Sequence, residues 1–199
     1  MITFYHAPRS RSFRTLWLLE EIGQPYEIKR VSIRRGDGSG SPDPENPHPH
    51  GKVPVIVHDG QTVFETTAIA LYLTDLFPAS GLGPKVGEPD RAAYVTWLSY
   101  YSGVFEPSLT AKFLKLQHVY GTFGWGPFEE VLNYLNRTLE TGAYFMGDRF
   151  SAVDIVFGGS LPVLMRGGMM PETAALKDYT ARITARPAFA RASAKDDAS

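Results

Sequence analysis

Residues 51–73 constrain the fold of this chain more than any other stretch. Residues 55–57 form a short β-branched run, Asp59-Gly60 is a dipeptide suited to a tight hairpin turn, and residues 63–64 resume the extended pattern. From residue 68 onward the apolar side chains recur with helical spacing. The stretch therefore predicts a β-hairpin that leads directly into a helix.

Each end of this predicted hairpin has a feature suited to ligand binding. Glu65-Thr66 stands where the helix must begin, and the free N–H groups and positive dipole end of a helix start can hold a carboxylate. Pro54 precedes the first strand, where a proline marks a bend or an edge. A cis bond before Pro54 would turn the backbone N–H and C=O of Val53 outward, ready to pair with an extended peptide. The sequence leaves the isomer open.

Taken together, Asn46-Pro47, Gly51-Lys52-Val53-Pro54 and Glu65-Thr66 resemble the glutathione site of the cytosolic glutathione transferase family. The usual pair at the last position is Glu-Ser, and Thr66 keeps the hydroxyl. The resemblance implies that the γ-glutamyl carboxylate of glutathione sits at Thr66 and its amino group at Glu65. It also implies that the cysteinyl backbone pairs with Val53 and that Lys52 reaches the glycyl carboxylate or backbone.

The opening of the chain predicts a βαβ unit. Residues 2–5 alternate as in a strand, residues 12–22 have helical spacing, and residues 26–33 indicate a second strand, so parallel pairing through a right-handed crossover is expected. Adding the hairpin and its helix gives βαβ followed by ββα. Periodicity alone supports an α/β class. This order resembles the thioredoxin-like domain of glutathione transferases, in which an all-helical domain follows.

Residues 5–23 closely resemble the first strand-to-helix segment of bacterial glutathione transferases. In serine-type members the catalytic hydroxyl stands four residues before an arginine of the helix, as Ser10 does before Arg14. Ser10 is therefore the expected catalytic residue, and Ser12 is the nearby alternative. Tyr5, at the end of the first strand, matches the tyrosine of the other large branch of the family. Either serine could instead simply cap the helix.

The chemistry explains why a hydroxyl is needed. A free thiol with a pKa of about 8.5 is only slightly ionised at neutral pH, and the thiolate is the nucleophile. A hydroxyl that donates to the sulfur, Arg11, or the start of the first helix would favour the charged form. Lowering the pKa by about two units corresponds to roughly 2.7 kcal/mol. Because the chain has no cysteine, the reacting sulfur must come from the ligand. The sequence around the serine lacks the histidine and carboxylate of a catalytic triad, which argues against a hydrolase.

Glycine and proline residues in the segment 78–88 predict a linker between domain 1–77 and an all-helical domain 89–199. One helix is expected over 89–105, interrupted at Pro107 before a second over 109–119. Tyr101 and Phe105 are candidates to line a pocket for an apolar second substrate, although core packing is an equal alternative for any one aromatic residue.

Two patterns mark the end of the chain. Ser151 and Asp154 have the spacing of a capping box at the start of an apolar helix, and we interpret this box as structural. The last helical pattern is followed by a polar tail of small residues from Ser193, which we expect to fray.

Composition limits the remaining function classes. Twenty basic and 21 acidic residues give no general field for nucleic acid or an anionic membrane. No apolar run has the length of a membrane span and the first residues lack a signal-peptide layout, so a cytoplasmic location is expected. His48 and His50 lie in a proline-rich loop without acidic or cysteine partners at helical spacing, and we expect no metal site.

The resemblance implies attack of the glutathione thiolate on a small apolar electrophile, with glutathione as co-substrate. It also implies a homodimer. Isomerisation, peroxide reduction, ether cleavage and dehalogenation are alternatives that share the first domain. A non-catalytic glutathione transferase-like module that binds partners is the alternative from another class.

Overall fold

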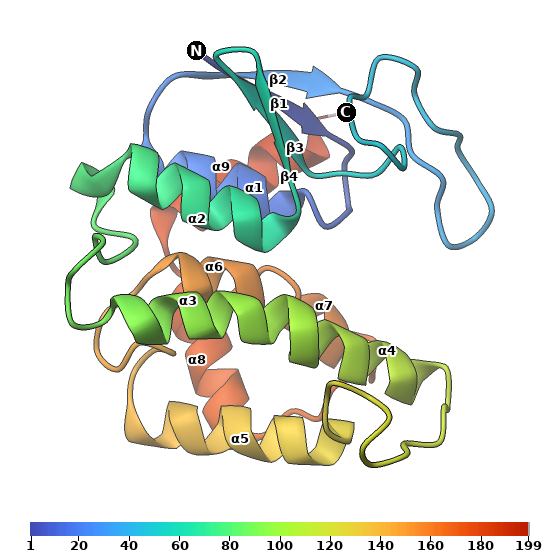
Figure 1. The fold of residues 1–199 in the computed structure, drawn as a ribbon, viewed down its shortest axis with the longest axis vertical. Helices are drawn as coiled ribbons and strands as arrows, with labels where there is room; N and C mark the ends of the chain where they lie inside the picture. Colours follow the sequence, from blue (N-terminus) through green and yellow to red (C-terminus); the bar gives the residue numbers. More distant parts are fainter. Residues whose placement is uncertain (199) are drawn as a thin grey trace.

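The computed structural model describes residues 1–198. Its first part contains a four-stranded mixed sheet in the order β2-β1-β3-β4, shown at the top of Figure 1. The strands β1 and β2 are parallel, whereas β1 with β3 and β3 with β4 are antiparallel. The bounds of the strands are β1 Ile2–His6, β2 Tyr26–Arg30, β3 Val55–His58 and β4 Gln61–Phe64.

The predicted hairpin is confirmed as β3 and β4. Asp59 and Gly60 both have positive φ values, 49° and 75°, as the tight two-residue turns of hairpins require. A single residue, Glu65, separates β4 from the helix α2, Thr66–Leu76. The turn and the helix start therefore lie where the sequence predicts them.

The βαβ unit is also confirmed, with α1 at Phe13–Ile22 between the parallel strands. The second strand was expected to continue to residue 33, but β2 ends at Arg30. Its partner β1 ends at His6, which pairs with Arg30, and the following Ala7-Pro8 leaves the sheet. Without a partner strand, the chain beyond Arg30 continues as a loop.

The second part is helical, as predicted, and lies below the sheet in Figure 1. A short 3₁₀ turn, η1 at Pro78–Ser80, precedes it. Its elements are α3 Arg91–Tyr100, the π-helical segment η2 Tyr101–Phe105, α4 Glu106–Phe113, α5 Phe128–Thr141, α6 Ala152–Gly158, α7 Leu161–Arg166, α8 Ala174–Thr184 and α9 Pro187–Asp197.

Three expectations for these helices were wrong. Pro107 does not interrupt the helical run from α3 through η2 to α4, because it occupies the first turn of α4, where its missing N–H is tolerated. The helix after it ends at Phe113 instead of continuing to residue 119. The tail from Ser193 is not frayed, because α9 extends through it to Asp197.

Charged groups hold α9 beside α1 (Figure 1). Arg186 binds Glu21 at 2.6 Å, and the nearly buried carboxylate of Glu20 accepts bonds from Arg191 at 3.0 Å and Lys195 at 2.5 Å. The small residues of the tail allow this approach, with Ala192 fully buried. The last helix of the chain is thus packed on the first.

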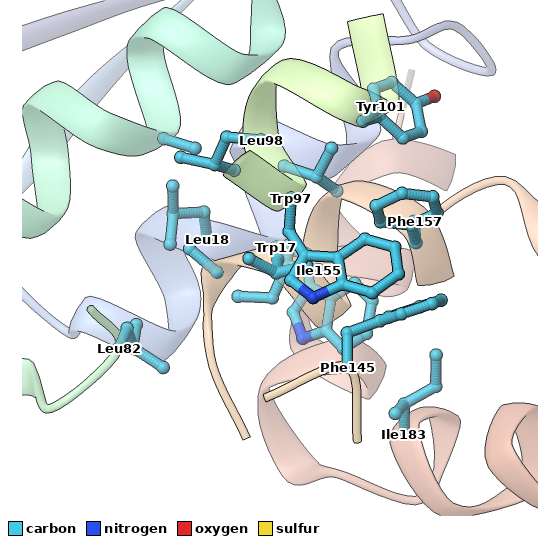
Figure 2. Close-up of a cluster of buried hydrophobic side chains, with 14 of the residues drawn as sticks. Trp17, Leu18, Leu82, Trp97, Leu98, Tyr101, Phe145, Ile155, Phe157 and Ile183 are labelled. Carbon is cyan, nitrogen blue, oxygen red and sulfur yellow. The ribbon is translucent and has the colours of Figure 1, made fainter. Parts of the chain in front are cut away.

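One hydrophobic core spans both parts of the molecule. Trp17 of α1 lies close to Trp97 and Leu98 of α3, Phe157 of α6 and Ile183 of α8 in Figure 2. Tyr101 lies at the edge of this cluster with its hydroxyl oxygen pointing away from it (Figure 2). The shared core fixes η2 against the first domain, and this places the helical wall of the cavity described below.

Residues 1–198 contain neither a membrane-spanning helix nor a cluster of metal-binding side chains. None of the helices combines the length and apolar character needed to cross a membrane. No three histidine or acidic side chains in this part of the chain converge as a metal site would require.

Candidate active site

A cavity of about 510 Å³ lies between the two parts of the molecule. Its walls come from the β1–α1 loop, the segment before β3, the start of α2, and the η2–α4 segment. Among the residues predicted to act on or bind a substrate, the cavity is lined by Ser10, Arg11, Lys52, Val53, Pro54, Glu65, Thr66 and Tyr101. Tyr5, Ser12 and Phe105 are not among its lining residues.

Ser10 is thus the one of the three candidate hydroxyls that lines the cavity. Its Oγ donates to the carbonyl oxygen of Ala7 at 2.7 Å and accepts from the backbone N–H of Ser12 at 3.2 Å. The preceding residue, Arg9, has a left-handed backbone with φ of 53°, which is uncommon for a residue other than glycine. This local turn carries Ser10 to the wall of the cavity.

Ser12 is fully buried behind Ser10. Its Oγ lies 2.8 Å from Oγ of Ser10 and 2.8 Å from Nδ1 of His6. Although Ser12 is the residue before α1, its side chain makes no capping hydrogen bond to the helix. The hydroxyl of Ser12 therefore contacts Ser10, and it does not cap the helix.

Tyr5 has different neighbours from either serine. Tyr5 lies on β1, and its half-buried side chain packs with Ala7, Val31, Val53 and Ile33. The ammonium group of Lys29 lies 5.7 Å from the ring centre. These contacts are those of an ordinary strand aromatic residue.

Sequence reasoning missed His6 and Asp196. Nε2 of the fully buried His6 lies 3.2 Å from Oδ1 of Asp196, which α9 contributes. Burial and the charge of Arg30 lower the pKa of His6 to about 4, so the imidazole is neutral at pH 7. A histidine and a carboxylate do therefore stand beside the serines. The expectation of no such pattern was wrong because the carboxylate is 190 residues from the histidine in sequence.

Glu106 was also missed, although it lines the cavity. Its Oε1 accepts from Nε of Arg11 at 3.0 Å, from the hydroxyl of Tyr101 at 2.8 Å, and from Nη1 of Arg14 at 3.4 Å. Burial by itself raises the pKa of Glu106, but the charges of Arg14 and Arg11 outweigh it, so the pKa lies below its ordinary value. The site holds a carboxylate that is ionised at neutral pH.

The start of α2 lies open to the cavity. No side chain caps this helix, and both Glu65 and Thr66 line the cavity. Glu65 has φ of 71°, a conformation that costs free energy for a residue with a side chain. Strained backbone of this kind clusters at binding sites. The helix start and its free N–H groups are suited to a carboxylate.

The segment before β3 forms the facing wall. The Val53–Pro54 peptide bond is cis, and both residues line the cavity. The carbonyl oxygen of Lys52 accepts from the side-chain amide of Asn46 at 2.9 Å. That bond joins the two parts of the predicted glutathione motif before the hairpin.

The two aromatic residues predicted to line a substrate pocket, Tyr101 and Phe105, lie in different surroundings. Tyr101 lines the cavity, whereas Phe105 is fully buried and packs on Phe157, with ring centres 5.3 Å apart. Both lie in η2, and their ring centres are 5.5 Å apart. A larger hollow of about 790 Å³ lies elsewhere, between η2 and α5, and includes Tyr100 and Trp125.

Comparison with known proteins identifies the family. The model of the glutathione S-transferase N-terminal domain matches residues 9–76, and that of the glutathione S-transferase C-terminal domain matches residues 128–187. Glutathione S-transferase 3 of Schizosaccharomyces pombe is 29% identical over 77% of this chain and 70% of its own length. A probable glutathione S-transferase of Nicotiana tabacum is 28% identical over 78% of this chain and 66% of its own length.

Solved structures agree over almost the whole chain. A glutathione transferase from Methylococcus capsulatus is 27% identical, with a TM-score of 0.80 and 98% of both chains covered. A sphingomonad glutathione S-transferase complexed with glutathione is 27% identical, with a TM-score of 0.79, and covers 99% of this chain and 100% of its own. With a thioredoxin-like domain followed by an all-helical domain, and with both family domains matched, this chain belongs to the glutathione S-transferase family of enzymes.

Proposed function

We propose that the protein binds glutathione in the cavity between its two parts and transfers it, as the thiolate, to a small apolar electrophile. The observation that carries the proposal is the meeting of Ser10 with Glu65-Thr66 and with cis Val53–Pro54 in one cavity. These residues are 40 or more positions from Ser10 in the sequence. The bound glutathione in the sphingomonad relative supports the same ligand here.

In this proposal, glutathione lies across the cavity as an extended peptide. Its γ-glutamyl carboxylate takes the free N–H groups at the start of α2 and the hydroxyl of Thr66, and its ammonium group faces Glu65. Its cysteinyl backbone pairs with Val53 as a strand would. Lys52, exposed at the cavity rim, is placed for the glycyl end.

The hydroxyl of Ser10 is proposed to stabilise the sulfur. Its proton now points to the Ala7 carbonyl, and the same O–H can rotate to donate to a thiolate in the cavity. A hydrogen bond to the charged form lowers the thiol pKa, and each unit is worth about 1.4 kcal/mol. Arg11 adds positive charge at the same wall, although Glu106 partly neutralises it. Ser12 and Tyr5 take no direct part, because neither lines the cavity.

The chemical step needs no covalent enzyme intermediate. The thiol loses its proton to solvent, and the thiolate lone pair forms a carbon–sulfur bond to the electrophile. In a substitution the leaving group departs with its bonding electrons, whereas in an addition the new carbanion takes a proton. The half-buried side chain of Ile33 offers apolar surface to the electrophile, while Tyr101, only 2% exposed, forms the wall beside Glu106. Phe105 is proposed only as support behind Tyr101.

The wider setting follows the family. We infer a cytoplasmic, bacterial, serine-type enzyme that works as a homodimer, with domains at 1–77 and 89–199 joined by residues 78–88. The break between α2, which ends at Leu76, and α3, which begins at Arg91, supports these domain bounds.

Titration of glutathione into the purified protein tests the proposal. Calorimetry measures binding, and the ultraviolet absorbance of the thiolate, followed against pH in the same sample, measures the thiol pKa. We expect binding with a thiol pKa at least one unit below that of free glutathione. Binding with an unchanged pKa would contradict thiolate activation, and no binding would favour a non-catalytic module.

A further inference from the structure

A buried row of polar side chains leads from the last helix to Ser10. Oδ1 of Asp196 lies 3.2 Å from Nε2 of His6, Nδ1 of His6 lies 2.8 Å from Oγ of Ser12, and that Oγ lies 2.8 Å from Oγ of Ser10. His6 and Ser12 are fully buried, and Asp196 is 6% exposed. Polar groups at such burial are costly unless they are paired. These buried polar groups form a continuous row that ends at Ser10 on the cavity wall, which points to a role in the site.

Asp196 also holds the backbone next to Ser10. The N–H of Arg9 donates to both oxygens of this carboxylate, at 3.1 Å and 3.3 Å. Arg9 is the residue with the left-handed φ of 53°, a conformation that costs free energy when a side chain is present. A charged acceptor on its N–H offsets that cost, because hydrogen bonds to ionised groups are among the stronger ones.

The carboxylate at one end of the row favours one direction for the hydrogen bonds that follow. An ionised carboxylate only accepts, so Nε2 of His6 carries the ring proton toward Asp196, although the pair is not aligned as a hydrogen bond. Nδ1 of the neutral ring is then an acceptor for the hydroxyl of Ser12, which also lies 3.1 Å from the carbonyl oxygen of Ala7. Both acceptors direct the proton of Ser12 away from Ser10, so the hydroxyl of Ser10 is left as a donor, here to the carbonyl oxygen of Ala7.

The helix that carries Asp196 is itself held in place. Arg30 donates to the carbonyl oxygens of Lys195 and Ala198 at 2.9 Å and 2.7 Å, which satisfies backbone groups at the end of α9. Neither His6 nor Asp196 lies in the residues matched by the two family domains, which are 9–76 and 128–187. The row therefore joins Arg9, Ser10 and Ser12, inside the first match, to two residues outside both matches.

We propose that Asp196 is a positioning residue for the Ser10 hydroxyl, acting through the backbone of Arg9 and through the His6–Ser12 pair. The last helix of the helical domain would in this way set the geometry of thiolate activation in the first domain. The inference rests on the proposed function, since it requires Ser10 to act on bound glutathione.

The test compares Asp196→Asn and Asp196→Ala with Lys195→Ala. Lys195 is the neighbouring residue on α9, and its side chain contacts Glu20 and Tyr26 but not the Ser10 loop. All three variants weaken the packing of α9, so a thermal denaturation midpoint alone does not separate them. The informative measurements are the pKa of the glutathione thiol in the complex, kcat, and KM for glutathione.

We expect Asp196→Ala to raise the bound thiol pKa toward the free value and to lower kcat about tenfold, with KM for glutathione changed less than twofold. Asp196→Asn, which is less disruptive to folding, should move both values in the same direction. Lys195→Ala should leave the thiol pKa unchanged. A wild-type thiol pKa in Asp196→Asn, or an equal shift in Lys195→Ala, would overturn the inference. An unactivated thiol in the wild-type complex would instead remove the proposed function, and this inference with it.

Discussion

The guanidinium Nε of Arg11 lies 3.0 Å from the carboxylate of Glu106. This contact joins the residue next to Ser10 to the first turn of α4, so the two parts of the molecule meet at the cavity wall. Arg14, only 6% exposed, approaches the same carboxylate oxygen at 3.4 Å. Glu106 is therefore the main negative charge beside two arginines of the first domain.

Replacing Glu106 with Gln should destabilise the fold. The variant leaves the buried Arg14 without its carboxylate and weakens the bond from Tyr101, and we expect the free energy of unfolding at pH 7 to fall by about 1–3 kcal/mol. Urea denaturation measures the change. Glu140→Gln, at an exposed position of α5, is the matched control and should change little.

The same variant should flatten the acid dependence of stability. The folded-state pKa of Glu106 is depressed below its ordinary 4.5, so the carboxylate stabilises the fold above about pH 4.5. That contribution is lost as the pH falls through the folded-state pKa. As the pH falls from about 5.5 to below about 4.5, the wild-type protein should lose more stability than Glu106→Gln. Parallel curves for the two proteins would contradict this assignment.

Glutathione affinity should depend on the hydroxyl of Thr66 and the charge of Glu65. We expect Glu65→Gln and Thr66→Ala each to raise Kd for glutathione about tenfold, which corresponds to about 1.4 kcal/mol. Thr66→Ser keeps the hydroxyl and should bind as tightly as the wild type. Calorimetric titration decides, and equal affinities for Thr66→Ala and Thr66→Ser would show that the hydroxyl is not used.

Basic side chains on the cavity rim should affect which electrophile reacts. Arg9, Arg34 and Arg35 line the cavity. Among matched chloronitrobenzenes, Arg34→Gln should lower kcat/KM about threefold or more for one that carries a carboxylate, and leave a neutral one unchanged. Arg137→Gln, on α5 outside this cavity, is the control. An equal loss for both electrophiles would contradict the electrostatic explanation.

The capping box of α6 should affect stability and not the site. The Asp154 carboxylate accepts from the backbone N–H groups of Phe145 and Ser151 and from the hydroxyls of Ser151 and Tyr179. We expect Asp154→Ala to cost about 3 kcal/mol and Ser151→Ala about 1 kcal/mol in urea denaturation. Asp148→Asn, at an exposed position, should be neutral. A changed glutathione Kd in folded Ser151→Ala would contradict a purely structural role.

Features that are determined by residues close together in the sequence were predictable. Asp59-Gly60 fixes the hairpin turn, the Ser151 and Asp154 spacing gives a real capping box, and Glu65-Thr66, just before the helical spacing that begins at residue 68, marks the start of α2. Each depends on the backbone preference or hydrogen bonding of residues within a few positions. Such short-range causes operate before any tertiary contact forms.

Features that depend on tertiary contacts were not predictable. Nothing in the local sequence indicates that Asp196 meets His6, because the contact exists only once α9 packs on α1. The tail appeared too polar to order, yet Lys195 finds the buried carboxylate of Glu20. Phe105 was predicted with Tyr101 as a pocket residue, yet it is fully buried against Phe157 of α6. In each case a contact with a distant element decides the outcome.

The central claim is that the hydroxyl of Ser10 activates glutathione. Its most direct test is the conjugation rate of Ser10→Ala, compared with Tyr5→Phe, using a chloronitrobenzene as the electrophile. We predict that Ser10→Ala lowers kcat/KM by about a hundredfold, as expected when about 2.7 kcal/mol of stabilisation is lost, while Tyr5→Phe stays within twofold of the wild type. An unchanged rate for Ser10→Ala together with loss of activity in Tyr5→Phe would contradict the account.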